Sequence, residues 1–139
     1  MSKAKFGFIV ITVLGFCMIS VADDYLLAEF KSVVSTPPTI SGKNVRVWNI
    51  RQNETIRINL VEMSGELALH KHPDADHSLV VLEGEVRVQI ADKKIVVHKG
   101  DFISIPANVP HKYWSLTKTA MLISMDAPYY DPAKTISLE

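Results

Sequence analysis

The chain has 139 residues, room for one domain, and 47% of them are hydrophobic, an ordinary content for a globular fold. It carries 15 basic and 15 acidic residues, with no basic stripe and no run of like charges. This balance argues against nucleic acid or an anionic membrane surface as the main partner.

The first 22 residues have the layout of a secretory signal peptide. Lys3 and Lys5 form a positive start, a charge-free apolar run covers 6–21, and cleavage is expected after Ala22. The run has 16 residues, fewer than the ~20 that a helix needs to cross a bilayer, which favours cleavage over retention as an anchor. The sequence therefore predicts an exported protein, periplasmic or secreted by a bacterium, with no stable membrane association after cleavage.

The only cysteine, Cys17, lies inside this signal peptide. A mature chain from Asp23 to Glu139 would contain no cysteine and could form no disulfide, so an oxidising compartment would not affect it. Without Lys3 and Lys5, 13 basic residues face 15 acidic ones, a formal charge of −2. Any metal in the mature chain would be bound by nitrogen and oxygen alone.

The mature chain is expected to begin with an N-terminal arm, residues 23–40. Residues 23–34 fit either one short helix or an extended segment, and Pro37-Pro38 ends it in both cases. Residues 41–126 are expected to form the barrel, and 127–139 an irregular C-terminal tail across it. Within residues 41–126, turn residues separate short runs that are apolar or alternate between apolar and polar. These runs predict nine strands, at 45–50, 55–61, 67–72, 77–82, 85–90, 94–98, 102–105, 111–115 and 120–125. Nine short strands predict an all-β, antiparallel fold, either a sandwich or a closed barrel.

Four of the five histidines fall into two short clusters. His70 and His72 are two residues apart on a predicted strand, so both side chains leave the same face. Counting in twos along the next strand places His77 on one face and Asp76 on the other. His111 opens a later strand, directly after the corner 106–110. Neutral imidazole is the commonest metal ligand in proteins, so convergence of these rings would form a metal site.

Other residues give weaker signals. Tyr113 lies two residues after His111 and should share its face, which makes it a candidate for a pocket. Trp48, Arg57 and Met121 could line the same cavity, although core or surface positions explain each of them equally well. The fifth histidine, His98, belongs to neither cluster and is expected on the surface.

The first cluster resembles the first motif of the cupin family, small jelly-roll barrels with a metal near the mouth. Gly65, His70, His72 and Gly84 match that motif, although the gap from Gly65 to His70 is one residue shorter than usual. Counting back from Gly84 places His77 where the family has a glutamate. The motif is therefore present in an all-histidine form.

The second cluster resembles the second cupin motif. Gly100, Pro106 and His111 match it, while Asn108 replaces a glycine and Ser115 replaces an asparagine. Two motifs in the right order, within a resemblance that covers residues 40–126, identify the chain as similar to the small single-domain cupins. The resemblance implies a single-domain jelly-roll β-barrel, and it implies that such barrels pair as homodimers through edge strands.

The resemblance also implies that one divalent transition metal (Fe, Mn, Zn, Ni or Cu) is coordinated by His70, His72, His77 and His111. Asp76 is an alternative fourth ligand if the strand slips by one residue or carries a bulge. Four imidazoles leave the charge of the cation uncompensated, which favours a bound anion. Four protein ligands on an ion that accepts five or six leave positions open for a substrate or O₂.

Three functions follow from this site. The first is a metal-dependent enzyme of dioxygenase, isomerase or lyase type, acting on a small organic molecule in an apolar pocket. The second is a non-catalytic module that binds a metal or a small ligand, since no acid–base pair besides the ligands is evident. The third is a barrel without metal, in which the histidines have no role. The sequence leaves the identity of the metal and of the substrate open.

Overall fold

The computed structural model describes residues 20–22 and 25–139. The chain divides into an N-terminal unit that ends at Pro37 and a second unit, Pro38–Glu139. The predicted signal peptide, 1–22, lies outside the described residues except for its last three. Within the part of the chain that is described, no helix is long and apolar enough to cross a bilayer.

The N-terminal unit contains a strand pair and one helical turn. β1 (Ser20–Ala22) pairs antiparallel with β2 (Tyr25–Leu27), and α1 (Phe30–Val33) follows. Pro37 and the proline after it follow the helix, and neither has the N–H that a continuing helix would need. The segment for which the sequence left helix and extended arm open therefore contains a short strand and a short helix.

The second unit is built almost entirely from strands, as the alternating pattern predicts. All nine predicted strands are present, with ends within two residues of the predicted ones, and two short strands, β3 and β13, are added at sheet edges. The elements are β3 (Ile40–Ser41), β4 (Val45–Gln52), β5 (Arg57–Met63), β6 (Glu66–Lys71), β7 (Asp76–Glu83), β8 (Glu85–Ile90), β9 (Lys93–His98), β10 (Phe102–Ile105), β11 (His111–Ser115), β12 (Ala120–Ala127), the 3₁₀ turn η1 (Pro132–Lys134) and β13 (Ile136–Ser137).

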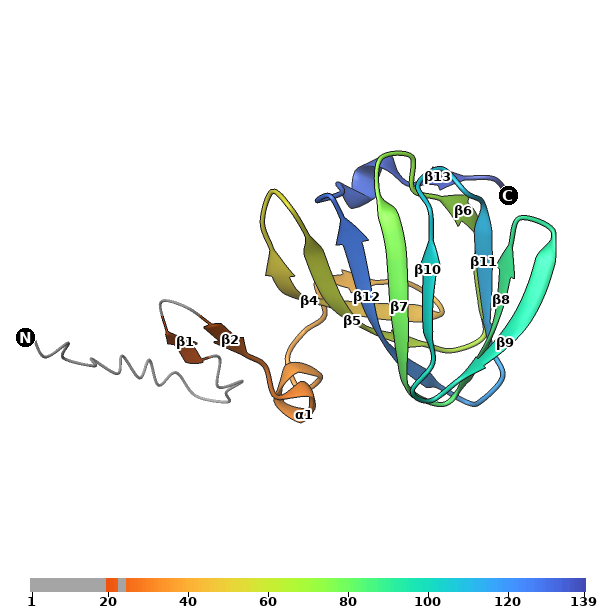
Figure 1. Cartoon of the computed structure of the whole chain (residues 1–139). Helices are drawn as coiled ribbons and strands as arrows, with labels where there is room; N and C mark the ends of the chain where they lie inside the picture. The colour runs from red at the N-terminus through yellow and green to blue at the C-terminus, as the bar shows by residue number, and fades with distance from the viewer. Residues whose placement is uncertain (1–19, 23–24) are drawn as a thin grey trace, which may run out of the picture. The chain divides into compact units, whose positions relative to one another are not determined.

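These strands form two antiparallel sheets that face each other, as Figure 1 shows. The first sheet has the order β10-β7-β12-β5-β4-β3, and the second has the order β13-β6-β11-β8-β9. Consecutive strands such as β6 and β7 lie in different sheets, so the chain crosses repeatedly between the two layers. This is the jelly-roll architecture, and it confirms the all-β fold expected from the sequence.

The inner face of the first sheet changes from polar to apolar along its strands. Successive cross-strand rows on β5, β12 and β7 read Arg57–Asp126–His77, then Asn59–Ser124–Leu79, then Val61–Leu122–Val81. The third row belongs to the hydrophobic core, together with Val86 and Val88 from the facing sheet. One end of the barrel interior is therefore a packed core, and the other end carries polar and titratable side chains.

The C-terminal tail is more regular than the irregular strap expected from the sequence. β13 pairs with β6, and the amide of Leu138 donates a hydrogen bond to the Leu69 carbonyl at 2.9 Å. The tail thereby covers a sheet edge whose backbone groups would otherwise lack partners. A two-residue strand carries too little periodicity to be predicted from the sequence.

Gly84 is the motif glycine whose replacement should destabilise the fold most. Its φ is +82°, and a Cβ added there would lie 2.5 Å from Thr117 Oγ1 and 2.8 Å from the Thr119 carbonyl oxygen. We expect Gly84→Ala to lower the free energy of unfolding by about 2–5 kcal/mol, from left-handed strain and overpacking together. Chemical denaturation of the two proteins measures this difference.

Gly100→Ala is the matched control for that substitution. Gly100 has a similar φ of +91°, but a Cβ there would meet no atom within 4 Å. Only the backbone strain remains, so a loss of about 1–2 kcal/mol is expected. Equal losses at both positions would contradict the steric role of Gly84.

Candidate metal centre

The four predicted histidines lie together at the polar end of the barrel interior. His70 is on β6, His72 directly follows β6, His77 is on β7, and His111 is the first residue of β11. The His111 ring centroid lies 4.4 Å from that of His70, 5.1 Å from that of His72 and 5.3 Å from that of His77. The centroids of His72 and His77 are 4.6 Å apart. Three separate stretches of chain therefore meet at one place.

Three of these rings are oriented through Nδ1. His70 Nδ1 is 2.7 Å from the Ala68 carbonyl oxygen, and His111 Nδ1 is 2.9 Å from the Val109 carbonyl oxygen. A carbonyl oxygen only accepts, so Nδ1 carries the proton in both rings and Nε2 keeps its lone pair. His77 Nδ1 lies 2.5 Å from Asp126 Oδ1. Metal-binding histidines are held in the same way, by an oxygen on the second ring nitrogen.

The remaining ring nitrogens include buried atoms without a partner. Nε2 of His111 and both ring nitrogens of His72 are buried and make no hydrogen bond. His111 is 1% exposed, and His72 and His77 are 9% exposed each, so water has little access to these rings. Buried polar atoms of this kind are rare, and each indicates strain or a bound group.

Burial favours the neutral form of three of the rings. Burial lowers the pKa of His72 to about 2 and that of His111 to about 3, and burial also lowers the pKa of His70. Neighbouring imidazoles act in the same direction, because a second positive charge at this distance is unfavourable. Neutral imidazole is the protonation state that binds metals, so these rings are ready to act as ligands near pH 7.

Asp126 joins the cluster, although it belongs to neither sequence motif and was not among the predicted site residues. Among the residues that the structure describes, the side chains that could hold a metal form two overlapping groups, His70 with His72 and His111, and His72 with His77 and Asp126. Asp126 is 4% exposed and lies on the inner face of β12 beside His77. Its inward position follows from the alternation Leu122, Ser124, Asp126, a signal that was present in the sequence.

Asp76, the alternative fourth ligand, lies on the other face of β7. Its side chain is exposed, and its Oδ1 accepts a hydrogen bond from the Ala107 amide at 2.9 Å. His77 lies on the buried face with Leu79 and Val81, as counting in twos predicted. The strand carries no slip or bulge at Asp76 that would reverse these positions.

The loop before β11 supports two of the histidines through its backbone. The amide of Asn108 donates to the His72 carbonyl at 2.6 Å, and the Val109 carbonyl receives the Nδ1 proton of His111. Asn108 has a φ of +66°, a conformation that asparagine tolerates better than most residues other than glycine. This explains in physical terms how Asn108 stands where the cupin motif has glycine.

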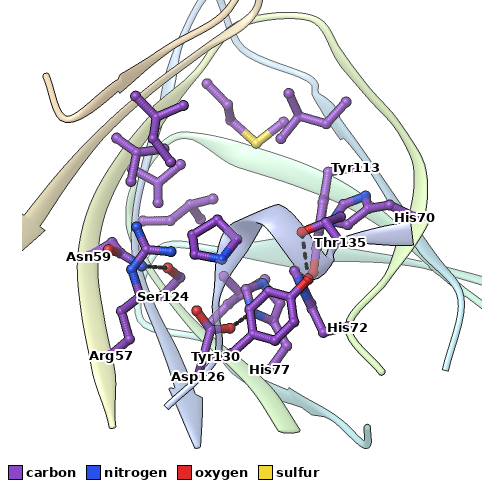
Figure 2. Close-up of a pocket in the computed structure, with 18 residues that line it drawn as sticks. Arg57, Asn59, His70, His72, His77, Tyr113, Ser124, Asp126, Tyr130 and Thr135 are labelled. Carbon is purple, nitrogen blue, oxygen red and sulfur yellow. Dashed lines mark hydrogen bonds and ion pairs between the residues drawn. The ribbon is translucent and has the colours of Figure 1, made fainter. Parts of the chain in front are cut away.

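Three of the four histidines border a cavity of about 150 Å³, and His111 lies outside its lining. Figure 2 shows His70, His72 and His77 on one side of it and the polar residues Arg57, Asn59 and Ser124 on another. Its lining is completed by Ile40, Val47, Val61, Met63, Leu67, Leu79, Tyr113, Leu122, Asp126, Tyr130, Pro132 and Thr135. The cavity is thus polar beside the histidines and apolar toward the core.

Tyr113 lines this cavity, where the sequence placed it as a candidate. It is 3% exposed, its hydroxyl is buried without a hydrogen-bond partner, and burial raises its pKa well above the ordinary value. Of the other candidates, Arg57 lines the cavity, whereas Trp48 and Met121 do not. Sequence reasoning missed Tyr130, whose ring lies edge-on to His72 at 4.7 Å.

His98 lies outside this cluster. Its side chain is 59% exposed, and its Nδ1 lies 3.5 Å from the exposed Asp101 carboxylate. The surface position expected from the sequence is what the structure shows. His98 and Asp101 form a solvent-exposed counterpart of the buried His77 and Asp126 pair.

Known proteins resemble this chain over the segment that contains the candidate site. The sequence profile of the cupin domain matches residues 59–126, the segment that contains all four clustered histidines. The uncharacterized protein YdbB of Bacillus subtilis is 36% identical over 66 residues, which cover 47% of this chain and 58% of YdbB. Quercetin 2,3-dioxygenase of Bacillus subtilis is 30% identical over 97 residues, or 60% of this chain and 29% of that enzyme.

The fold is also that of solved structures. The structure of KdgF from a Halomonas species aligns with a TM-score of 0.64 at 18% identity, covering 68% of this chain and 90% of KdgF. A jelly-roll barrel with a histidine-bordered cavity at one end of its interior is the arrangement that the sequence motifs implied. The profile match to the cupin domain over residues 59–126, together with this fold, supports a cupin-superfamily protein with a single cupin domain.

Proposed function

We propose that His70, His72, His77 and His111 together hold one divalent transition metal ion. The observation that carries this proposal is the set of buried, unpartnered nitrogens on His72 and His111. Leaving such a group unsatisfied costs about 1–3 kcal/mol, and a metal ion is the partner that suits several neutral imidazoles at once. His70 and His77 each have Nδ1 engaged, which leaves Nε2 for the same ion.

The donor set suits the divalent transition metals expected from the sequence. Imidazole suits Fe, Zn, Ni and Cu and also accepts Mn, while no thiolate is present in the residues that the structure describes around the site. Asp126, bonded to His77, adds a negative charge beside the ligands. That charge compensates in part for the negative charge that the site lacks because His77 stands where the family has a glutamate.

We propose further that the site is enzymatic and acts on a small organic molecule, with chemistry of the dioxygenase, isomerase or lyase type. A bound ion would supply Lewis-acid polarisation or O₂ activation. The cavity of about 150 Å³ is smaller than the ~300–1,000 Å³ of sites for drug-sized ligands, which favours a small substrate. The likeness to quercetin 2,3-dioxygenase over 60% of this chain supports an oxygenase among these classes.

Tyr113 has a distinct role in this proposal. Because burial raises its pKa, the phenol keeps its proton, and its hydroxyl has no partner within the protein. The ring lies 5.4 Å from that of His111 and 6.1 Å from that of His70, centroid to centroid. Tyr113 would donate a hydrogen bond to an oxygen of the substrate and so orient it against the histidines.

A non-catalytic binding module is the second candidate. The observation that favours it is the scarcity of acid–base groups in the cavity. Among its lining residues Asp126 is the one carboxylate, and that carboxylate is already bonded to His77. Such a module would bind a small molecule at the same place without converting it.

Location and assembly are part of the proposal as well. The basic start, apolar run and small residues before Ala22 support export to the periplasm or the medium. The family resemblance supports a homodimer. Sizing of the mature protein and fractionation of the producing cell would test these two points.

The enzymatic proposal is tested with protein purified without an affinity column. Metal content is measured first, and then O₂ uptake and product formation are followed with a panel of catechols and diketones. We expect about one metal per chain, turnover of at least one compound, and loss of turnover after chelation. Re-addition of the metal should restore turnover.

The same preparation separates the candidates. Saturable binding of a panel compound without product would favour the binding module over the enzyme. Protein that purifies without metal, binds none when it is added, and is unaffected by chelator would contradict both.

A further inference from the structure

Arg57 is the one guanidinium that lines the cavity. It opens β5 in the polar row of the first sheet, opposite Asp126 on β12, and it is 6% exposed. Figure 2 shows it on the same wall of the pocket as Asn59 and Ser124. Arginine is rarely buried to this extent unless it is paired.

The Arg57 guanidinium has no such pair among the residues that the structure describes. Its Nε is buried without a hydrogen-bond partner, and no carboxylate forms an ion pair with it. Asp126, its cross-strand neighbour, is bonded to His77 instead. Arg46, which lies partly in solvent, does pair with Glu62. Arg57, the more buried of these two arginines, therefore faces the cavity without an anionic partner.

Two further features mark this wall as an anion site. Ser124 Oγ accepts a hydrogen bond from Asn59 Nδ2 at 3.1 Å, and within the described residues its own proton goes to no acceptor. Arg57 also lines the same cavity as His70, His72 and His77. The guanidinium and the histidines thus act on one small enclosed space.

We propose that Arg57 binds the carboxylate of a small organic acid, with Ser124 as a second donor, while the acid's other end faces the histidines. This inference rests on the proposed function, whose substrate class it names. A guanidinium matches a carboxylate through two parallel hydrogen bonds, which fixes orientation as well as charge. Val61, Met63 and Leu122 provide the apolar surface for the body of the acid.

The test compares acids with their neutral amides. Acetate, butanoate and benzoate are each titrated beside acetamide, butanamide and benzamide, by calorimetry, into the zinc-loaded protein and into the metal-free protein. We expect at least one acid to bind at least about tenfold more tightly than its amide in both forms. Arg57→Met should abolish that preference, and Arg57→Lys should retain part of it.

The control variant is Arg46→Met, which removes the exposed arginine and should leave the preference unchanged. Arg57→Met should fold at least as stably as the wild type, since it replaces an unpaired buried charge with an apolar side chain of similar length. Arg57→Gln is a second neutral variant should the methionine not be tolerated.

The outcomes separate this inference from the metal proposal. No preference for any acid, or a preference that survives in Arg57→Met, would overturn the role of Arg57 whatever the metal content. A preference that depends on Arg57 in protein that binds no zinc would uphold it and contradict the metal site. Unchanged zinc content in Arg57→Met, with the acid preference lost, is the expected combination.

Discussion

The double variant His77→Ala, His111→Ala is expected to purify without stoichiometric metal. It leaves two of the four proposed ligands, His70 and His72, which come from one stretch of chain. Loss of an outer-shell partner alone lowers metal affinity by about 10–100-fold. If each direct ligand contributes at least that much, loss of two of them should lower the affinity by about 100–10,000-fold or more. Metal analysis of the purified protein, followed by competition with a chromophoric chelator, measures the change.

His98→Ala provides the control for this double variant. His98 is exposed and lies outside the cluster, so its removal should leave metal content and affinity unchanged. Circular dichroism checks that the double variant remains folded, because His111 is 1% exposed and its truncation leaves a cavity. A folded double variant that keeps one metal per chain would refute the site.

Asp126→Asn is expected to weaken metal binding by about 10–100-fold while leaving the fold intact. The substitution keeps the size of the side chain but removes the negative charge that orients His77 through Nδ1. A histidine that donates to a carboxylate is a better ligand than one that donates to a neutral amide, because the carboxylate raises the basicity of the ring. Chelator competition in the wild type and the variant gives the ratio of affinities.

Asp101→Asn is the matched control for Asp126→Asn. Asp101 also approaches a histidine, but that pair is exposed to solvent, and the aspartate additionally accepts from the His98 amide. This variant should change metal affinity by less than the error of the titration. If Asp126→Asn changed metal affinity as little as Asp101→Asn, the role of Asp126 in orienting His77 as a ligand would be contradicted.

Much of the fold could be predicted from the sequence because the alternation of side chains along a strand depends only on neighbouring residues. Alternation of apolar and polar residues places His77, Leu79 and Val81 on one face of a strand without any knowledge of its neighbours. Strand pairing is not local. β12 lies between β5 and β7, far apart in the chain, and only the packed sheet brings Asp126 beside both Arg57 and His77.

The candidate site divides in the same way. Two short motifs point to all four histidines, since spacing along β6 and the corner before β11 already specify their faces. Asp126 and Tyr130 belong to no motif, and only the tertiary structure brings them beside the histidines. Tyr130 lies in the tail that the sequence predicted to be irregular. Arg57 was visible as a candidate, but its lack of a partner is a property of the folded cavity.

The central claim is that four imidazoles from three stretches of chain share one cation. Crystals of the zinc-loaded protein, with diffraction recorded on both sides of the zinc absorption edge, test it most directly. We predict a single anomalous peak within about 2.0–2.1 Å of one nitrogen from each of His70, His72, His77 and His111. A peak elsewhere, or a zinc site in which His77 takes no part, would contradict the account.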